Sequence, residues 1–133
     1  MKFLDTNIFI RYLTNDIPVK ADECEKIFKK AVKKEETFYT TDMVIAEIVW
    51  VLESYYGLPK EGVQDKVEKI LNTPNLICTN KDLILSALTL YSQKNIDFID
   101  AYNALMMKNK GIEEIYSYDK HYDRVEWLTR LEP

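Results

Sequence analysis

Five acidic residues stand where a carboxylate is either unusual or well placed for chemistry. Asp5 ends the apolar stretch KFLD, Asp119 ends YSYD, and Glu47 interrupts the apolar run VIAEIVWVL. The stretch IDFIDAYNAL carries Asp97 and Asp100 three positions apart, so on a helix these two acids share a face and repel each other. If Asp5, Glu47, Asp100 and Asp119 meet, their repulsion requires a cation.

Each acid also has an ordinary explanation. Asp97 fits an N-cap and Asp100 the third position of a helix, where backbone N–H groups and the helix dipole favour acids. Glu47 is harder to explain, because an isolated carboxylate buried among apolar residues is costly. It must be paired, protonated, bound to a metal or at the edge of the helix, and a partly exposed Glu47 remains the alternative.

A ligand set of carboxylates favours Mg²⁺ or Mn²⁺ over zinc. Cys24 and Cys78 show no metal-ligand spacing, and His121 is the single histidine, with a surface or outer position predicted for it. Carboxylate-held Mg²⁺ polarises phosphoryl oxygens and activates water, so we predict metal-assisted phosphodiester hydrolysis. Kinase or NTPase chemistry is disfavoured, because a chain with three glycines has no glycine-rich phosphate loop.

Short apolar strands that alternate with helices must position these acids. Such alternation is typical of the α/β class, with a mainly parallel sheet covered by helices on both faces. The carboxyl ends of parallel strands share one edge, to which Asp5 and Asp119 would point. Apolar spacing and end signals predict strands over 2–5, 37–40, 76–79 and 114–119, and helices over 6–13, 19–36, 43–56, 60–72, 81–94 and 96–110.

The chain as a whole has the size of one domain, spanning residues 1–133 with a mass of 15.7 kDa. A net charge of −4 gives no general attraction to nucleic acid, and the lysines of 26–36 alternate with apolar residues as on a solvated helix face. We expect no signal peptide and no membrane span, and two idle thiols in the reducing cytoplasm.

Four blocks of the sequence together resemble the PIN domain, and in particular the VapC-like toxin ribonucleases of type II toxin–antitoxin systems. The blocks are DTNIFIRYLTND, VIAEIVWVLESYYGL, IDFIDAYNALMM and YSYDKHYDR, and they cover nearly the whole chain. The resemblance implies an α/β/α sandwich in which Asp5, Glu47, Asp100 and Asp119 are the catalytic and metal-binding acids. It also implies a set of residues that line the site: Thr6, Asn7, Asp97, Ser117 and Asp123.

The resemblance further implies an activity and partners. The expected activity is cleavage of RNA with Mg²⁺ or Mn²⁺. Our own mechanistic hypothesis is that cleavage leaves a 5′-phosphate and a 3′-hydroxyl and that Arg11 and nearby lysines contact RNA phosphates. The expected partners are a cognate antitoxin and a second copy in a homodimer. Ser117 stands where many relatives have threonine, and it keeps the hydroxyl.

Other functions stay open at this stage. The same fold could serve as a non-catalytic scaffold that binds proteins, or as a solitary RNA-processing nuclease outside a toxin pair. A phosphatase with an aspartyl nucleophile generally needs a second acid two positions after the first, where this chain has Asn7. A receiver domain needs a phosphoacceptor aspartate after a central strand, and LICTN offers none.

Overall fold

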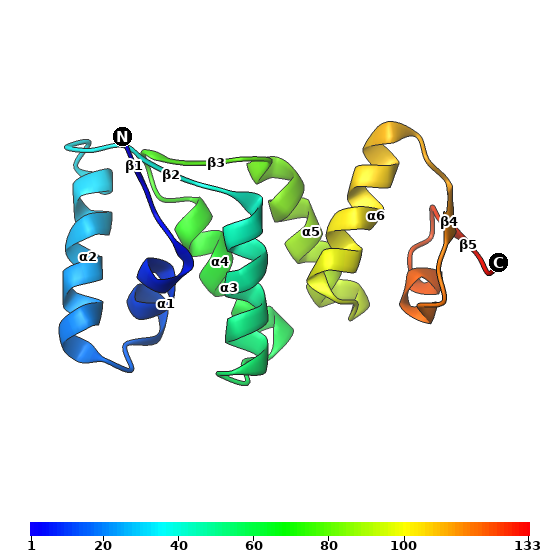
Figure 1. Ribbon diagram of the computed structural model, residues 1–133, viewed down its shortest axis with the longest axis horizontal. Coiled ribbons are helices and arrows are strands. Elements are labelled where there is room, and N and C mark those ends of the chain that lie inside the picture. The colour runs from blue at the N-terminus through cyan, green and yellow to red at the C-terminus, as the bar shows by residue number, and fades with distance from the viewer. The chain divides into compact units, whose positions relative to one another are not determined.

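The computed structural model describes residues 1–133 and divides them into two compact units, Met1–Lys81 (the N-terminal unit) and Asp82–Pro133 (the C-terminal unit). The first contains β1 (Lys2–Phe3), α1 (Thr6–Thr14), α2 (Pro18–Val32), β2 (Phe38–Thr40), α3 (Asp42–Ser54), α4 (Lys60–Leu71) and β3 (Leu76–Cys78) (Figure 1). The second contains α5 (Lys81–Lys94) except for its first residue, α6 (Phe98–Lys110), β4 (Glu114–Tyr116), the 3₁₀ helix η1 (Lys120–Arg124) and β5 (Thr129–Leu131).

The N-terminal unit has a three-stranded sheet in the order β1-β2-β3, and both strand pairs are parallel. In the central strand β2, Phe38 lies opposite Lys2 in β1 and opposite Leu76 in β3, which defines the register of the sheet. Parallel neighbours need crossover connections, and helices supply them between β1 and β2 and between β2 and β3. The predicted α/β class and parallel pairing are therefore confirmed.

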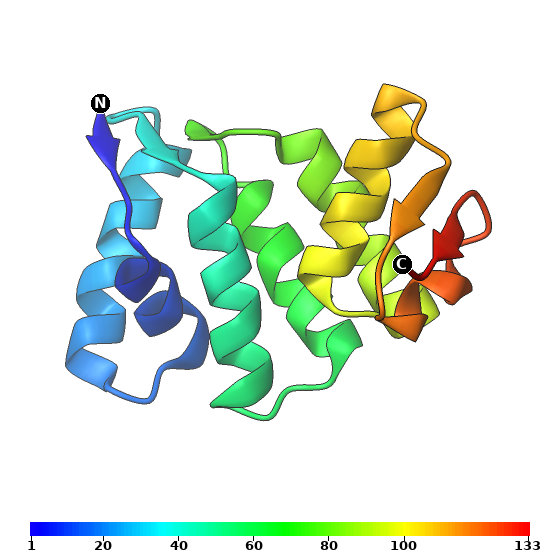
Figure 2. The ribbon, with the colours of Figure 1, turned by 45° about the vertical axis from the view of Figure 1, so that its right-hand side comes forward.

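The C-terminal unit has a sheet of its own, in which β4 pairs in parallel with β5 (Figure 2). The sequence predicts a strand over 114–119 and after it a short helical or irregular tail that contains Trp127; the strand bounds and the absence of a further strand need correction, whereas a short helix is present. The strand ends at Tyr116, and the tail contains η1 and a three-residue strand. Thr129–Leu131 is too short to show a period, so its pairing with Glu114–Tyr116 leaves no pattern in the sequence.

Local signals set the ends of the helices. Thr41 caps α3, because its hydroxyl accepts a hydrogen bond from the backbone N–H of Val44 at 3.3 Å. Pro18 opens α2 at a position where its missing N–H is not needed. Asn15 ends α1 and Gly111 ends α6, each with a left-handed backbone.

Two helices end earlier than the apolar spacing predicts. The predicted helix over 19–36 ends at Val32, and Lys34 then takes a positive φ of 61°. The predicted helix over 43–56 ends at Ser54, before the turn that contains Gly57 with φ 65°. In both cases a residue with a left-handed backbone follows the end of the helix and prevents its continuation. The pattern of apolar and charged residues extends past this point, so the sequence predicts longer helices.

Each unit buries an apolar core. In the N-terminal unit the helices contribute residues with no exposed surface, among them Phe9, Ile45, Ile48, Leu52, Val63, Val67, Ile70 and Leu71. In the C-terminal unit the fully buried side chains of α5 and α6 include Ile84, Leu88, Tyr91 and Ala101. These residues follow the three- and four-residue spacing of amphipathic helices, so hydrophobic burial stabilises each unit from within.

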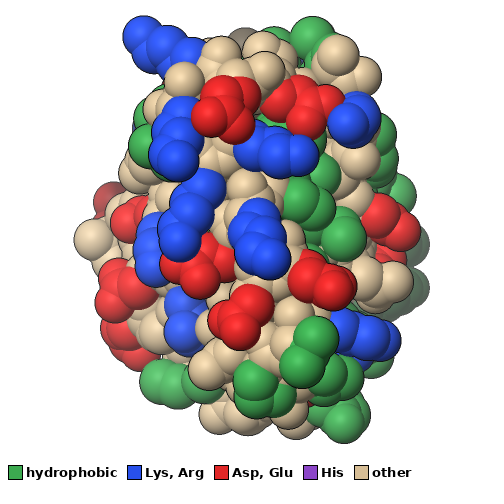
Figure 3. Space-filling model, turned by 90° about the vertical axis from the view of Figure 1, so that its left-hand side faces the viewer, with side chains coloured by type: hydrophobic (Ala, Val, Ile, Leu, Met, Phe, Trp, Pro, Cys, Tyr) green, Lys and Arg blue, Asp and Glu red, His purple; other side chains and the backbone are tan.

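The lysines of α2 lie in solvent, as predicted. Lys26, Lys29 and Lys30 are exposed whereas Phe28 and Ala31 are buried. Figure 3 shows lysine and arginine side chains interspersed with acidic ones on the face that carries α2, so this face has no uniformly basic surface. The structure contains no helix with the length and apolarity that a bilayer crossing requires.

Candidate metal centre

Asp97 and Asp100 lie at the beginning of α6, where the sequence predicts them. Asp97 is the N-cap residue, with an extended backbone, and Asp100 is the third helical residue. However, the Asp97 side chain makes no capping hydrogen bond. Asp97 therefore occupies the predicted N-cap position, but its carboxylate does not accept a hydrogen bond from the backbone of the first helical turn.

Asp119 lies in the turn between β4 and η1. Its Oδ1 accepts a hydrogen bond from the backbone N–H of His121 at 2.9 Å, and the Ser117 hydroxyl accepts one from the backbone N–H of Asp119 at 3.0 Å. These two bonds hold the turn in one conformation. Ser117, predicted as a site-lining residue, thus acts on the orientation of Asp119.

The structure places the side chains of Asp100 and Asp119 close enough for each to shift the pKa of the other. Burial raises the pKa of Asp100, and the hydrogen bond and negative charge of Asp119 raise it further. The backbone N–H of His121 is the main cause that lowers the pKa of Asp119. Two carboxylates this close cannot both ionise freely, so the pair either shares a proton or needs a neighbouring cation.

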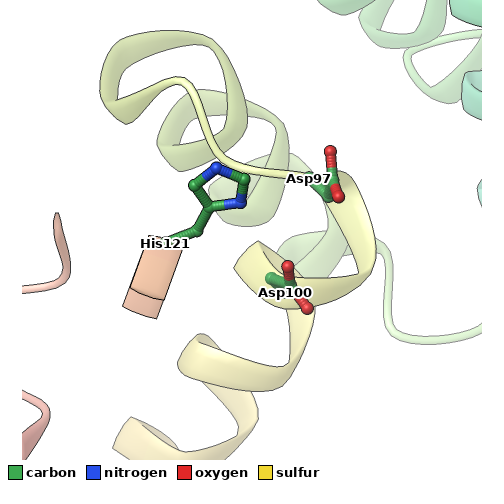
Figure 4. Close-up of side chains that lie close together, drawn as sticks. All are labelled: Asp97, Asp100 and His121. Atoms are coloured by element: carbon green, nitrogen blue, oxygen red, sulfur yellow. The ribbon is translucent and has the colours of Figure 1, made fainter. Parts of the chain in front are cut away.

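His121 lies beside these acids with 45% of its side chain exposed, which agrees with the surface or outer position that the sequence predicts. One ligand atom each of Asp97, Asp100 and His121 lies within 4.8 Å of the others (Figure 4). The Nδ1 atom of His121 is 3.2 Å from Asp119 Oδ1, but it is buried and has no hydrogen-bond partner. Carboxylate oxygens and a ring nitrogen this close together fit a divalent cation, which would accept both kinds of ligand atom.

Tyr122 is a site residue that the sequence does not single out. It is buried, and its hydroxyl donates a hydrogen bond to Asp100 Oδ1 at 3.1 Å. The same hydroxyl is hydrogen-bonded to the side chain of Asn103 on α6. The only signal in the sequence is its spacing of three residues from Asp119, which a 3₁₀ helix turns into proximity.

Asp123, predicted to line the site, is paired with a cation of the chain itself. The Nε atom of Arg130 lies 2.9 Å from Asp123 Oδ1, and Nη1 of the same guanidinium lies 2.7 Å from Glu132 Oε1. Arg130 Nη1 also donates to the backbone carbonyl of Ser117 at 3.0 Å. Asp123 therefore contributes to a network that ties β5 to the turn before Asp119.

In the N-terminal unit, Asp5 follows β1 and caps α1. The backbone at Leu4 is held in place because the buried Thr40 hydroxyl donates to its carbonyl at 3.0 Å. The next residue, Asp5, is exposed, and its Oδ1 accepts a hydrogen bond from the Thr6 N–H at 2.8 Å. Thr6 is buried and Asn7 is exposed in the first turn of α1. The predicted position of Asp5 at the carboxyl end of β1 is thus confirmed.

Glu47 is exposed, so the inference that it is buried among apolar neighbours is wrong. The helix α3 buries only one stripe, which consists of Val44, Ile45, Ile48, Val49 and Leu52. Glu47 lies on the opposite face with Met43 and Trp50, which are 78% and 66% exposed. The sequence overestimates the burial of Glu47, because the exposed face of α3 also carries large apolar side chains. Apolar composition therefore does not distinguish its exposed face from its buried face.

The PIN domain profile matches residues 2–128, which include all four predicted acids. The chain belongs to the PIN domain family. The VapC ribonuclease of Aquifex aeolicus (strain VF5) is 30% identical to this PIN domain over 129 residues, which are 97% of this chain and 95% of the relative.

Among solved structures, this PIN domain is similar to VapC20 of Mycobacterium tuberculosis, a toxin that cleaves the sarcin–ricin loop. The similarity covers 100% of both chains, with a TM-score of 0.44 and 16% identity. Family membership confirms the resemblance drawn from the four sequence blocks, since the family profile and the Aquifex relative both extend over nearly the whole chain.

Proposed function

We propose that this PIN domain is a metal-dependent endoribonuclease and the toxin of a toxin–antitoxin pair. The observation that carries the proposal is the pair of neighbouring carboxylates Asp100 and Asp119, with the Nδ1 atom of His121 3.2 Å from Asp119 Oδ1. Such a pair is stabilised by a divalent cation, and cations held by carboxylates act on phosphates. The 30% identity to a VapC ribonuclease points to RNA as the phosphodiester that is cleaved.

The proposed catalytic and metal-binding residues are Asp5, Glu47, Asp100 and Asp119. Asp5 and Glu47 are supported by exposed carboxylates in the matched family region, and Asp100 and Asp119 by their direct contact. Around them, Tyr122 aligns Asp100, and Ser117 aligns the turn of Asp119. The proposed lining residues are Thr6, Asn7, Asp97, Ser117 and Asp123.

We propose Mg²⁺ or Mn²⁺ as the ion, which when bound polarises the phosphoryl oxygen and lowers the pKa of water. In the reaction, the oxygen of water forms a bond to phosphorus, the bond from phosphorus to the 3′ oxygen breaks, and that oxygen takes a proton. The products are a 5′-phosphate and a 3′-hydroxyl. The chain's carboxylates contribute by staying ionised, which the N–H of His121 favours at Asp119.

The proposed partners are a cognate antitoxin and a second copy of the chain in a homodimer, acting in the cytoplasm. Support for the toxin role comes from the VapC relative, which this chain matches over 95% of that protein's length. A solitary RNA-processing nuclease would use the same site. An adjacent gene for a small DNA-binding protein, co-purifying with this chain when both are expressed, would distinguish the two.

Cleavage of a mixed RNA pool by the purified chain tests the proposal. We expect cleavage with Mg²⁺ or Mn²⁺, and none with EDTA or in the Asp100→Asn variant. Mapping of the product ends should give 5′-phosphates. A folded chain that cleaves no RNA in the pool with either ion, while binding a protein partner through a site that Asp100→Asn leaves intact, would support the non-catalytic scaffold instead.

Replacing Glu47 by Gln separates function from folding. Because the side chain is exposed, we expect the free energy of unfolding to change by no more than about 0.5 kcal/mol. RNA cleavage should nevertheless fall by on the order of 100-fold, because a charge next to the reacting phosphate is lost. Glu35→Gln, an exposed acid after α2, is the matched control and should cleave like the wild type. Equal activity of both variants would remove Glu47 from the site.

Replacing Tyr122 by Phe removes the hydrogen bond to Asp100 and keeps the buried ring. We expect RNA cleavage to fall by about 10-fold, as is typical when a group that orients a metal ligand is lost. The concentration of Mn²⁺ needed for half-maximal activity should rise, which a purely structural role would not produce. Unchanged cation dependence together with lower thermal stability would show that Tyr122 only fills the core.

A further inference from the structure

A cavity of about 340 Å³ opens between α1 and α2 of the N-terminal unit. Its lining consists of Asn7, Ile8, Arg11, Lys20, Glu23 and Cys24. The cavity begins in the first turn of α1, two residues after Asp5. Asn7 and Arg11 are four residues apart on one face of the helix, about 6 Å along its axis. The cavity thus extends away from one of the acids that we assign to the reaction.

Arg11 is held in this cavity by a network of hydrogen bonds. Its Nη1 atom donates to both carboxylate oxygens of Asp16, at 3.0 and 3.2 Å. Asp16 in turn accepts hydrogen bonds from the Tyr56 hydroxyl at 2.6 Å and from the Thr14 hydroxyl at 3.0 Å. The Tyr56 hydrogen bond is the main cause that lowers the pKa of Asp16, which keeps this anchor charged.

This network leaves most of the guanidinium available. All its contacts use Nη1, so the Nε and Nη2 donors of Arg11 point to no other group of the chain. A guanidinium whose orientation is fixed loses less rotational entropy when it binds an anion.

The remaining lining groups favour an anion. Lys20 is exposed and forms no ion pair, and the Asn7 amide supplies a further donor. Glu23 is the one acid of the lining, and Asp16 already pairs with Arg11, so the site depends on the exposed Lys20 and on the remaining donors of Arg11 and Asn7 rather than on an excess of positive charge. Burial raises the pKa of the Cys24 thiol, which therefore adds no negative charge at neutral pH. No aromatic ring lines the cavity on which a base could stack.

We propose that this cavity is a subsite for a phosphate group of the RNA substrate, next to the scissile one, with Arg11, Lys20 and Asn7 as its donors. The proposal rests on the proposed ribonuclease function and names residues that bind the substrate in the same reaction. Charged and amide donors without a stacking surface recognise the backbone of RNA rather than its bases. A local site of this kind also explains how a chain with net charge −4 holds a polyanion. Asp16 is a positioning residue, because it acts only through Arg11.

The salt dependence of RNA binding tests the subsite. Binding of a labelled mixed RNA pool is measured in the Asp100→Asn background, where no cleavage interferes, over a series of KCl concentrations. Each lost phosphate contact should reduce the slope of log affinity against log salt by about 0.7, so Arg11→Gln with Lys20→Gln should reduce it by about 1.4. In the otherwise wild-type chain, the same pair should raise KM for RNA more than it lowers kcat.

Two further variants keep the result interpretable. Lys26→Gln removes a charge of the same type from the exposed face of α2 outside the cavity, and it should leave the slope unchanged. Lys20→Gln alone leaves the Arg11–Asp16 pair intact, so it tests the subsite even if the double variant unfolds. If the wild type cleaves RNA but the slope of Lys20→Gln equals that of Lys26→Gln, the subsite is wrong while the ribonuclease stands. If the wild type neither binds nor cleaves RNA, the ribonuclease proposal itself fails.

Discussion

Asp100→Asn will reduce RNA cleavage by on the order of 1000-fold or more, because it removes one carboxylate of the pair that we assign to the divalent cation. The same variant should be more stable than the wild type at neutral pH in the presence of EDTA. The pKa of Asp100 is raised in the folded chain by burial and by Asp119, so its charged form destabilises the fold. Asparagine keeps the shape and removes that charge.

The sign of this effect changes with pH in a defined way. A carboxyl group with a raised pKa in the folded state loses stabilisation as the pH rises through that pKa. Thermal unfolding should therefore show an advantage for Asp100→Asn at neutral pH that disappears in acid, where Asp100 is protonated. Asp119→Asn should be less stable than the wild type at neutral pH, because the pKa of Asp119 is lowered. A loss of stability in Asp100→Asn at neutral pH would contradict the strained carboxylate pair.

Removal of divalent cations will abolish RNA cleavage, again by on the order of 1000-fold or more, and Mn²⁺ or Mg²⁺ will restore it. The reason is the proximity of Asp100 and Asp119, because two neighbouring carboxylates at the reacting phosphate are stabilised by a divalent cation. The measurement is cleavage of an RNA pool after dialysis against EDTA, followed by titration with each ion.

Ca²⁺ and Na⁺ at matched ionic strength serve as controls for screening and for folding. Neither ion should restore much activity, because the reaction needs an ion that activates water, and screening of charge alone is not sufficient. Full cleavage in EDTA by a preparation that also loses activity in Asp100→Asn would show that the acids work without a cation.

The elements were predictable wherever apolar spacing and end signals agree. The α6 helix ends at Lys110 as predicted, because Gly111 adopts a left-handed backbone after it, and it begins at Phe98, two residues after the predicted start at 96. The short strand at Thr129–Leu131 could not be predicted, since its pairing with β4 depends on a contact that is distant in the sequence.

The side-chain contacts of the site were less predictable than its acids. The order of the acids and the family resemblance indicate Asp100 and Asp119, and the structure brings these two together. Tyr122 and His121 reach the pair only because η1 is a 3₁₀ helix that folds back onto α6, a geometry that the sequence YDKHYDR does not specify.

For Glu47, the sequence predicts the wrong environment. Its apolar neighbours indicate burial, yet only the stripe with Ile45 and Ile48 is buried, and Trp50 remains exposed on the same face as Glu47. Apolar composition alone does not reveal which face of a helix meets a core, because exposed faces also carry large apolar residues.

Titration of the metal-free chain with Mn²⁺, followed by the electron paramagnetic resonance signal of the free ion, tests the central claim most directly, since it requires no knowledge of the RNA target. The proposal predicts Mn²⁺ binding by the wild type that is lost in Asp100→Asn and in Asp119→Asn. Asp82→Asn, an exposed acid in the first turn of α5, should bind Mn²⁺ like the wild type. Equal Mn²⁺ binding by all four proteins would contradict a metal centre at the Asp100–Asp119 pair.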